Sequence, residues 1–361
     1  MKRLLAALLA AVCFAVPIFS YDISARGAVL YDCLTGTVLW EKQGDRVMGM
    51  ASTTKIMTAL TALELYDPAQ IVTVRPEWTG IEGSSMYLRV GERLTAEQLL
   101  YGLMLMSGND AAAALAGLHP DGQAGFVAEM NQKAAAMGLS DTHFDNPSGL
   151  DGETHHTTAR DLARLTAAAL ENPAFAAIVG TRSATVAGRY MKNHNRLLFQ
   201  LEGCIGVKTG FTKACGRCLV SAVQRQGRRF IAVTLGDPDD WRDHTVLYED
   251  TFARLQATEL LPAGLYGSVP VVDGSRSSVC LEVREPVTLA LCAEELEQIT
   301  WQVTGPRFLY APVEAGQEYG TVTARLKDAV ILEKELYCVS AVDQLPEPDL
   351  RQKIQIWLES R

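Results

Sequence analysis

The sequence is poor in positive charge: its 33 Lys and Arg residues are outnumbered by 42 Asp and Glu residues, which leaves a net charge of −9. A chain this acidic repels phosphate groups over most of its surface, which argues against a nucleic-acid partner. It also lacks a polybasic patch that could hold it on anionic lipid. Internal repeats and low-complexity stretches are absent, and 48% of the residues are hydrophobic against 21% charged, as in folded globular proteins.

Cysteines and long apolar runs are scarce as well. Eight cysteines in 361 residues are far fewer than a small disulfide scaffold needs. The single long apolar run, residues 4–16, follows Lys2 and Arg3 and is ended by Pro17, which is typical of a secretory signal peptide. Removal of residues 1–20 would take the net charge from −9 to −11, because Lys2 and Arg3 would be lost.

An uncleaved membrane anchor is the alternative for the same segment, since no charge appears between Arg3 and Asp22. Either interpretation places the protein outside the cytoplasm, in the cell wall or at the outer face of the cytoplasmic membrane.

Strand and helix signals are segregated along the chain. Two β-rich runs around a turn predict a hairpin over residues 27–41, and three more predict strands between residues 204 and 236. Apolar residues at helical spacing lie between and after them, over residues 52–67, 95–106, 110–139, 157–171 and 243–255. This order predicts an α+β fold, in which an antiparallel sheet with adjacent first and late strands is flanked by helices and carries an all-helical lobe.

The pattern changes near Pro262 and Gly264, after which short alternating runs predict a small all-β domain. The expected organisation is a signal peptide (1–20), a larger domain (21–261), a small β-rich domain (262–345) and a tail (346–361). The tail places four apolar residues on one helical face: Leu350, Ile354, Trp357 and Leu358. That face could contact a membrane peripherally or dock on the small domain, and the low positive charge favours docking.

Three short motifs carry candidate chemistry. The first, "STTK", places Ser52 and Lys55 one helical turn apart, so that the ammonium can lie against the hydroxyl. A serine becomes a nucleophile when a base takes its proton, and a lysine can do so if burial and a second cation keep it neutral. Taken alone, the motif also describes a capping serine followed by a surface lysine.

The other two motifs supply polar groups at element ends. "SGN" puts Ser107 and Asn109 in a turn after an apolar helix, where a helix C-cap with a left-handed Gly108 is the structural alternative. "KTG" ends a β-rich run, and a glycine there lets a substrate backbone approach the strand edge. Lys208 adds a second positive charge, and Thr209 adds a hydroxyl for an anionic terminus.

In this order, the three motifs form the signature of class A β-lactamases and penicillin-binding proteins. The chain resembles the serine-type D-alanyl-D-alanine carboxypeptidases, the low-molecular-mass penicillin-binding proteins, over residues 26–345. Four segments carry the resemblance: ASTTKIMTAL, LLYGLMLMSGNDAAAALA, THFDNPSGLDGETHHTTARDLA and GVKTGFTKACGRCLVSA. The β-lactamase/transpeptidase-like fold followed by a small β domain is what the resemblance implies.

The resemblance also implies an activity: removal of the terminal D-alanine from peptidoglycan pentapeptides through an acyl-enzyme on Ser52, with covalent inhibition by β-lactam antibiotics. Lys55 would be the base, Ser107 would relay a proton to the leaving group, and Lys208 would lower the proton affinity of Lys55. Asn109 would bind the amide carbonyl of the substrate, and Thr209 would bind the substrate's terminal carboxylate. Lys208, Gly210 and Phe211 complete the expected substrate-binding residues. The backbone N–H groups of Phe211 and Ser52 would form the oxyanion hole. No cofactor or metal is implied.

Two positions qualify the resemblance. Gly108 stands where the lactamases carry Asp, which suits the carboxypeptidases. Ser148 stands where some relatives carry a histidine, so no catalytic role is expected of its loop.

Arg242 is a candidate for binding the substrate carboxylate, because some relatives use an arginine in this region. A solvated surface arginine is the alternative.

Other enzyme classes fit less well. A class A β-lactamase needs a glutamate within Glu-x-x-Leu-Asn, and the sequence contains no Leu-Asn pair. A non-catalytic penicillin-binding sensor stays open, although intact motifs disfavour it. A zinc carboxypeptidase would have as candidate ligands only His155, His156, Cys204, Cys215 and Cys218. The sequence has no His-Glu-x-x-His motif, and the two adjacent histidines would point to opposite faces of an extended segment. His156 is expected to anchor its loop by hydrogen bonding. A Gly-x-Ser-x-Gly elbow is absent.

The cysteines near the KTG motif allow a disulfide. Cys204 and Cys218 fall on consecutive predicted strands, and a bridge between them, with Cys215 as a competitor, is one hypothesis. Free cysteines packed as small hydrophobic residues are the other.

Overall fold

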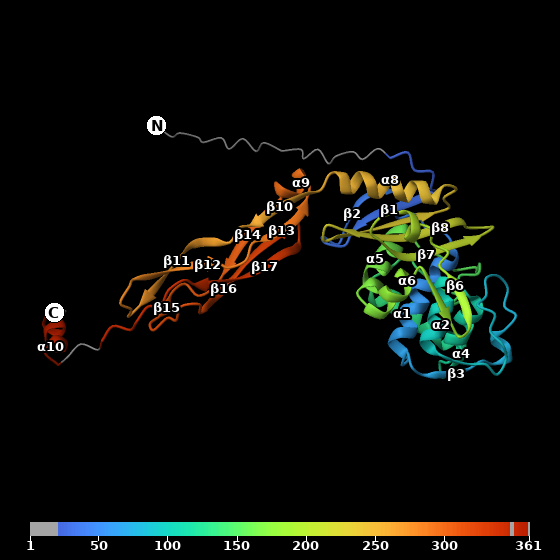
Figure 1. Ribbon diagram of the computed structural model, residues 1–361, viewed down its shortest axis with the longest axis horizontal. Helices are drawn as coiled ribbons and strands as arrows, with labels where there is room; N and C mark the ends of the chain where they lie inside the picture. Colours follow the sequence, from blue (N-terminus) through green and yellow to red (C-terminus); the bar gives the residue numbers. More distant parts are fainter. Residues whose placement is uncertain (1–20, 347–349, 360–361) are drawn as a thin grey trace, which may run out of the picture.

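The computed structural model describes residues 21–346 and 350–359, so the predicted signal peptide lies outside the described residues. The chain forms two units that lie end to end (Figure 1). The larger unit is coloured from blue to yellow, and the elongated β-rich unit from orange to red.

A five-stranded antiparallel sheet organises the larger unit, in the order β2-β1-β9-β8-β7. Its strands are β1 (Gly27–Asp32), β2 (Thr37–Lys42), β7 (Cys204–Thr212), β8 (Gly216–Arg225) and β9 (Arg228–Leu235). The pairing of β1 with β9 confirms that the first and late strands are adjacent. β7 is left at the edge of the sheet, where an extended peptide can pair with its free backbone groups.

The sheet is buried on both faces. Val29 of β1 and Ile231 of β9 face the helical lobe, whereas Leu30 and Phe230 face α8 (Asp240–Ala253) and contact its Leu247. This follows from the strand geometry, because successive side chains point to opposite faces. In Figure 1, α8 covers one face of the sheet and the lobe covers the other.

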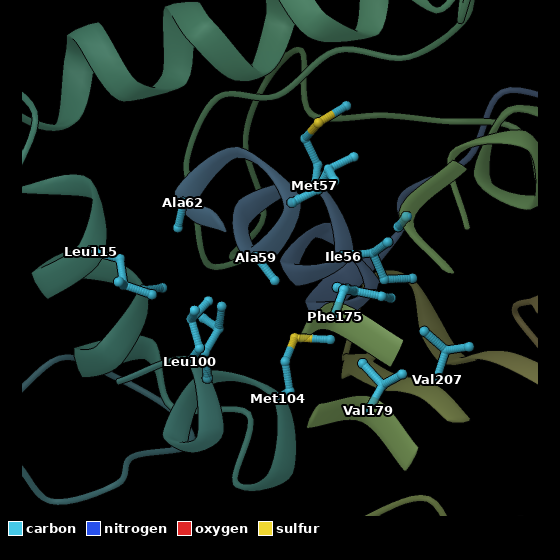
Figure 2. Packing of buried hydrophobic residues seen from close by; sticks show 14 of the residues in the cluster. Ile56, Met57, Ala59, Ala62, Leu100, Met104, Leu115, Phe175, Val179 and Val207 are labelled. Atoms are coloured by element: carbon cyan, nitrogen blue, oxygen red, sulfur yellow. The ribbon is translucent and has the colours of Figure 1, made fainter. Parts of the chain in front are cut away.

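The helical lobe surrounds α1 (Lys55–Leu65), which touches each of the other five helices. These are α2 (Ala96–Leu105), α3 (Asn109–Ala116), α4 (Gly122–Ala136), α5 (Ala159–Leu170) and α6 (Pro173–Gly180). Figure 2 shows Ile56 and Ala59 of α1 among Leu100, Met104 and Phe175 from its neighbours. Because α1 lies inside the lobe, its first residue, Lys55, is buried as well.

Short elements complete the larger unit. They are the 3₁₀ turns η1 (Ala51–Thr54) and η2 (Pro76–Trp78), the pair β3 (Ile71–Thr73) and β4 (Arg93–Thr95), the pair β5 (Ser183–Val186) and β6 (Arg189–Lys192), and the one-turn helix α7 (Leu197–Gln200).

The second unit is β-rich, as predicted, with one short helix, α9 (Ala293–Leu296). Its six-stranded sheet has the order β14-β16-β17-β12-β11-β15, and β10 and β13 form a separate pair. The strands are β10 (Gln256–Leu261), β11 (Gly264–Val272), β12 (Ser278–Val283), β13 (Val287–Leu291), β14 (Ile299–Thr304), β15 (Leu309–Tyr310), β16 (Glu318–Leu326) and β17 (Ala329–Cys338).

The start of this unit differs from the boundary expected between residues 261 and 262. β10 pairs with β13, so residues 256–261 form part of the second unit. Pro262 lies in the turn between β10 and β11 and Gly264 begins β11, and the change in composition therefore marks a turn inside the unit.

The tail is helical, as predicted, in α10 (Leu350–Glu359). Its four apolar residues are exposed by 76% (Leu350), 52% (Ile354), 53% (Trp357) and 61% (Leu358), so the expected docking of this face on the β-rich unit is wrong. Among the described helices, none is by itself long and apolar enough to cross a bilayer; α5 and α6 pass that test only as a pair, across a bend of 107°.

The disulfide hypothesis is also wrong. All seven cysteines in the described part of the chain are free thiols. The register of the β7–β8 ladder explains this, because Cys204 lies opposite Val223 and Cys218 lies opposite Gly210. Consecutive strands alone do not place two cysteines within bridging distance.

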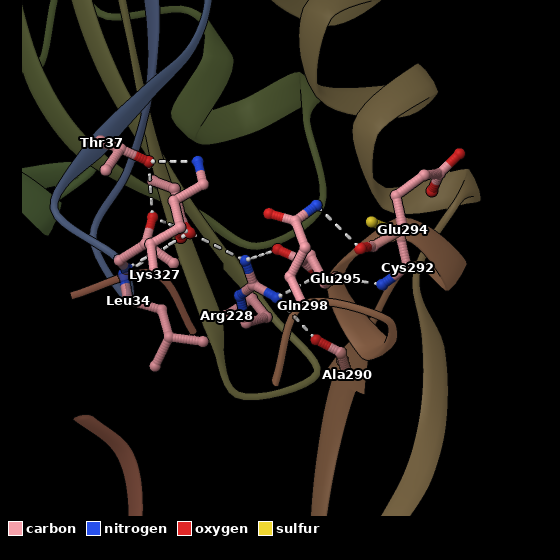
Figure 3. Close-up of polar contacts among 11 residues, drawn as sticks. Leu34, Thr37, Arg228, Ala290, Cys292, Glu294, Glu295, Gln298 and Lys327 are labelled. Carbon is pink, nitrogen blue, oxygen red and sulfur yellow. Dashed lines mark hydrogen bonds and ion pairs between the residues drawn. The ribbon is translucent and has the colours of Figure 1, made fainter. Parts of the chain in front are cut away.

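A buried arginine joins the two units. Arg228, at the start of β9, is 2% exposed and donates to Asp32 at 2.9 Å. It also donates to Glu295 of α9 at 3.0 Å and to the Ala290 carbonyl at 2.7 Å (Figure 3). Asp32 is fully buried, so this guanidinium is the charge that compensates its carboxylate. The contact fixes the end of the larger sheet against the β-rich unit.

We predict that Arg228→Leu lowers the free energy of unfolding by about 3–5 kcal/mol, because it leaves the Asp32 carboxylate buried without its counter-charge. The neighbouring Arg229→Leu is the matched control, since Arg229 pairs with an exposed Glu171 and its loss costs below about 1 kcal/mol. Urea unfolding followed by tryptophan fluorescence measures both. Equal effects of the two substitutions would contradict the prediction.

Candidate active site

A cleft of about 1060 Å³ opens between the β7 edge and the helical lobe. Five predicted site residues line it: Ser52, Ser107, Thr209, Gly210 and Phe211. The other three, Lys55, Asn109 and Lys208, are buried. The structure therefore brings all three motifs, which are far apart in the sequence, to one place.

Lys55 is at the centre of the site. Its Nζ lies 3.0 Å from Ser52 Oγ, 2.7 Å from Asn109 Oδ1 and 2.5 Å from the carbonyl oxygen of Ser148. The side chain has no exposed surface. The "STTK" serine and lysine are thus in hydrogen-bond contact, and the capping-serine interpretation does not apply.

The protonation state of Lys55 follows from its surroundings. Burial, and next to it the nearby Lys208, hold the pKa of the Lys55 amine well below its ordinary value, against a smaller opposing effect of Asp110. A neutral amine has two N–H donors and one lone pair. If the donors serve Asn109 Oδ1 and the Ser148 carbonyl, the lone pair is left for the Ser52 hydroxyl proton. This is the arrangement that a general base for Ser52 requires.

The Ser148 loop contributes through its backbone. No catalytic role was expected of this loop because Ser148 replaces a histidine of some relatives, yet its carbonyl accepts from Lys55. Asn146 Oδ1 accepts from the N–H groups of Ser148 and Gly149 at 3.1 and 2.8 Å, which fixes the turn. Backbone contacts of this kind carry no side-chain signature that a sequence pattern could reveal.

Asn109 is held at both ends of its amide. Oδ1 accepts from Lys55, and Nδ2 donates to the Glu82 carbonyl at 2.6 Å. One Nδ2 hydrogen remains for a substrate carbonyl, because a carboxamide nitrogen has two. In this structure the residue therefore orients the base as well as offering a donor.

The turn after α2 differs from the expected helix cap. Gly108 has an ordinary φ of −61°, and the left-handed residue is Ser107, with φ of 56°. Gly108 is needed for space, since a Cβ there would lie 2.8 Å from Asp110 Oδ1 and 3.1 Å from the Met86 nitrogen. The unusual backbone of Ser107 brings its side chain into the cleft, a kind of strain that is typical of functional sites.

Lys208 lies on β7 behind the cleft and is 1% exposed. Its Nζ donates to the Thr209 carbonyl at 2.7 Å, and burial lowers its pKa to about 7. The neighbouring Gly210 is in close contact with the nucleophile, because a Cβ on it would lie 3.0 Å from the Ser52 nitrogen. The backbone of β7 at residues 210–211 therefore runs beside the Ser52 N–H, as an oxyanion hole requires.

Both adjacent histidines anchor the loop under Ser52. His156 does so as predicted, because its Nδ1 lies 2.7 Å from the Thr154 carbonyl oxygen, and His155 does so from a buried position. His155 Nδ1 accepts from the Asp145 N–H at 3.0 Å, and burial lowers the pKa of the ring to about 4. The proton of this neutral ring is then on Nε2, which lies 2.7 Å from Thr54 Oγ1, and Thr54 in turn donates to the Ala51 carbonyl. The two histidines are adjacent, and only the fold decides which one is buried.

The arginine that lines the cleft is Arg217 and not Arg242. Arg242 donates to the Asp22 carbonyl and to Asp243, and it is not among the residues that line the cleft. Arg217 of β8 does line it, and Asp240 holds its guanidinium through Nε at 3.1 Å and NH2 at 2.5 Å. Sequence reasoning missed Arg217; the signal that could have found it is its place at the start of the strand that follows KTG.

No group of three or more His, Cys, Asp or Glu side chains in the described part of the chain is placed to hold a metal ion.

Comparisons with known proteins agree with this geometry. A sequence model described as D-alanyl-D-alanine carboxypeptidase matches residues 14–239, and one described as the C-terminal domain of penicillin-binding protein 5 matches residues 256–344. The chain is 31% identical to the D-alanyl-D-alanine carboxypeptidase DacF of Bacillus subtilis, over 85% of this chain and 83% of that protein. It is 30% identical to DacA of Escherichia coli, over 92% of this chain and 86% of that protein.

Solved structures are similar as well. Penicillin-binding protein 5 of Haemophilus influenzae superposes with a TM-score of 0.66 at 26% identity, covering 91% of this chain and 100% of that one. An S96A mutant of the Streptomyces K15 DD-transpeptidase superposes with a TM-score of 0.62 at 34% identity, covering 65% of this chain and 100% of that one.

We predict that Gly149→Ala slows acylation by benzylpenicillin about 10²-fold, because a Cβ at this position would lie 2.0 Å from the Ala51 carbonyl oxygen and displace Ser52. Gly80→Ala is the control, since its φ of +69° resembles the +83° of Gly149 but nothing lies within 4 Å. The control should cost about 1 kcal/mol of stability and leave the acylation rate unchanged. If both variants are acylated equally fast, the close packing under Ser52 does not position the nucleophile.

We predict that Lys208→Gln moves the acidic limb of the pH–rate profile for acylation upward by about one pH unit. The positive charge of Lys208 lowers the pKa of Lys55. Without it, the pKa of Lys55 rises, and Lys55 stays protonated and inactive as a base up to a higher pH. The exposed Lys213→Gln, which removes the same charge outside the cleft, should leave the limb in place. A limb that stays or moves to lower pH in Lys208→Gln is inconsistent with this coupling.

Proposed function

This chain belongs to the D-alanyl-D-alanine carboxypeptidase family, and we propose that Ser52 is its nucleophile and Lys55 the base that activates it. The chain is a serine-type D-Ala-D-Ala carboxypeptidase, a hydrolase that acts on peptidoglycan peptides outside the cytoplasm and binds penicillins. One observation supports the assignment of the two residues above all: a lysine without exposed surface lies 3.0 Å from the hydroxyl of a serine that lines the cleft.

Acylation begins when the lone pair of Lys55 accepts the Ser52 proton and Oγ attacks the carbonyl carbon of the penultimate D-alanine. The negative charge that develops on the carbonyl oxygen is stabilised by the backbone N–H groups of Ser52 and Phe211. Collapse of the tetrahedral intermediate breaks the peptide bond. Ser107 donates its proton to the leaving nitrogen and takes up the proton that Lys55 accepted, so D-alanine departs and Lys55 is neutral again.

Hydrolysis of the acyl-enzyme reverses these roles. Lys55 accepts a proton from water as the water attacks the ester carbonyl, and it then returns a proton to Ser52 Oγ as the ester bond breaks. Asn109 Oδ1 and the Ser148 carbonyl keep the Lys55 nitrogen in place in both half-reactions. A β-lactam would follow the first half-reaction, because its strained amide takes the place of the terminal peptide bond.

The terminal carboxylate is assigned to Thr209 and Arg217. Thr209 and Phe211 lie two residues apart on β7 and share one face, and Phe211 lies opposite Arg217 in the ladder. The Thr209 hydroxyl and the Arg217 guanidinium therefore reach the cleft from the same side. Asp240 uses two of the five N–H donors of Arg217, which leaves others for a carboxylate.

Attachment of the protein is proposed through the tail. Leu350, Ile354 and Leu358 of α10 form an exposed apolar face. Such a face can lie in the interface of a membrane. This supports a peripheral position at the outer face of the cytoplasmic membrane, with the β-rich unit between the tail and the active site.

Intact-mass analysis with benzylpenicillin tests the nucleophile. The wild-type chain should gain one penicilloyl group and release D-alanine from an acyl-D-Ala-D-Ala peptide, whereas Ser52→Ala should do neither. Ser84→Ala, which changes another serine of the cleft, should behave as wild type. Labelling that survives Ser52→Ala would place the nucleophile elsewhere. A labelled chain that releases no D-alanine would indicate a sensor, and fast turnover of nitrocefin would indicate a β-lactamase.

A further inference from the structure

The cleft is positively charged at one end, although the whole chain carries a net charge of −9. Among its lining residues the basic side chains are Lys192, Arg196 and Arg217, and the acidic one is Asp240. Asp240 is paired with Arg217. Lys192 and Arg196 are exposed, and neither has an ion-pair partner within the described parts of the chain. Two cations are thus left uncompensated inside a cleft, where low-dielectric walls strengthen the field they produce.

These two side chains are held by elements of the site. Lys192 ends β6, directly after the buried Met191, and its Nζ lies 5.1 Å from the centre of the Phe199 ring, within the range of a cation–π contact. Arg196 precedes α7, whose first residue, Leu197, is buried in the core under α8. Both cations are therefore presented by anchored backbone to the same hollow as Ser52.

The proposed function leaves no task for them. The terminal carboxylate is assigned to Thr209 and Arg217, and the chemistry to Ser52, Lys55, Ser107 and Lys208. Peptidoglycan stem peptides, however, contain carboxylates besides the terminal one. Resting on that function, we propose that Lys192 and Arg196 form a second anion subsite, which binds a carboxylate of the peptide substrate other than its C-terminal carboxylate.

A carboxylate at this subsite could belong to either side of the scissile bond: to the acyl part of the peptide or to the side chain of the leaving residue. The chemistry recognised is the same, and one reference peptide with two pairs of peptides separates the sources. The reference peptide ends in D-Ala-D-Ala and has a neutral acyl part. The first pair carries a glutamate or a glutamine in the acyl part, and the second pair ends in D-Glu or D-Gln in place of the terminal D-alanine.

The test compares release of the C-terminal residue by the full chain and by three variants. Lys192→Gln/Arg196→Gln should lower kcat/KM about ten-fold for one of the acidic peptides and leave its neutral amide counterpart unchanged. The pair that shows the effect identifies the source. The loss should act mainly through KM and should shrink as ionic strength rises.

Two controls make the result specific. Lys213→Gln/Arg46→Gln removes two exposed charges outside the cleft and should not change the acid-to-amide ratio. Arg217→Gln should reduce kcat/KM for all peptides alike, because each keeps its terminal carboxylate.

The proposal is overturned if Lys192→Gln/Arg196→Gln has the same acid-to-amide ratio as the wild type for both pairs. Failure of the subsite can be told from failure of the proposed function. In the first case the variant still hydrolyses the neutral peptide and is acylated by benzylpenicillin at Ser52; in the second, the wild type does neither.

Discussion

The Lys55 and Lys208 side chains are both buried behind the cleft, and burial together with the nearby Lys208 makes it harder for Lys55 to hold a proton. Burial of a charge is costly unless it is compensated, so the cheapest state of the pair keeps one nitrogen neutral. The neutral one lies against Ser52. Much of the larger unit serves this arrangement: α1 buries Lys55, the edge strand β7 presents Lys208, and the Ser148 loop and Asn109 hold the amine in place.

The sequence was sufficient for the architecture because its local signals agree with the tertiary structure. Alternation along β1 and β9 reflects two buried faces, and the apolar character all round "LLYGLMLM" reflects a helix inside the lobe. The three motifs predict one site because their order and contexts match a family pattern. Spacing alone would not have brought the "STTK" and "KTG" motifs together, since that depends on the packing of η1 against β7 in the folded chain.

What could not be predicted depends on register, burial and backbone geometry. Cys204 and Cys218 lie on paired strands but opposite other residues. His155 and His156 differ only in which ring the loop buries. Arg217 enters the cleft because it lies opposite Phe211 in the ladder and is held by Asp240. Arg242, on the same helix as Asp240, instead donates to the Asp22 carbonyl. The identity of a single residue does not reveal its strand register, its burial or the direction of its side chain, so none of these three outcomes could be predicted.

The most direct test of this account is the titration of Lys55 itself, by NMR of the full chain labelled with ¹³C at the lysine ε-carbon. Lys55→Arg removes one resonance and so assigns it. The account predicts that this amine loses its proton well below the ordinary lysine range. A Lys55 resonance that titrates together with the exposed lysines would contradict it, because an ammonium cannot accept the Ser52 proton.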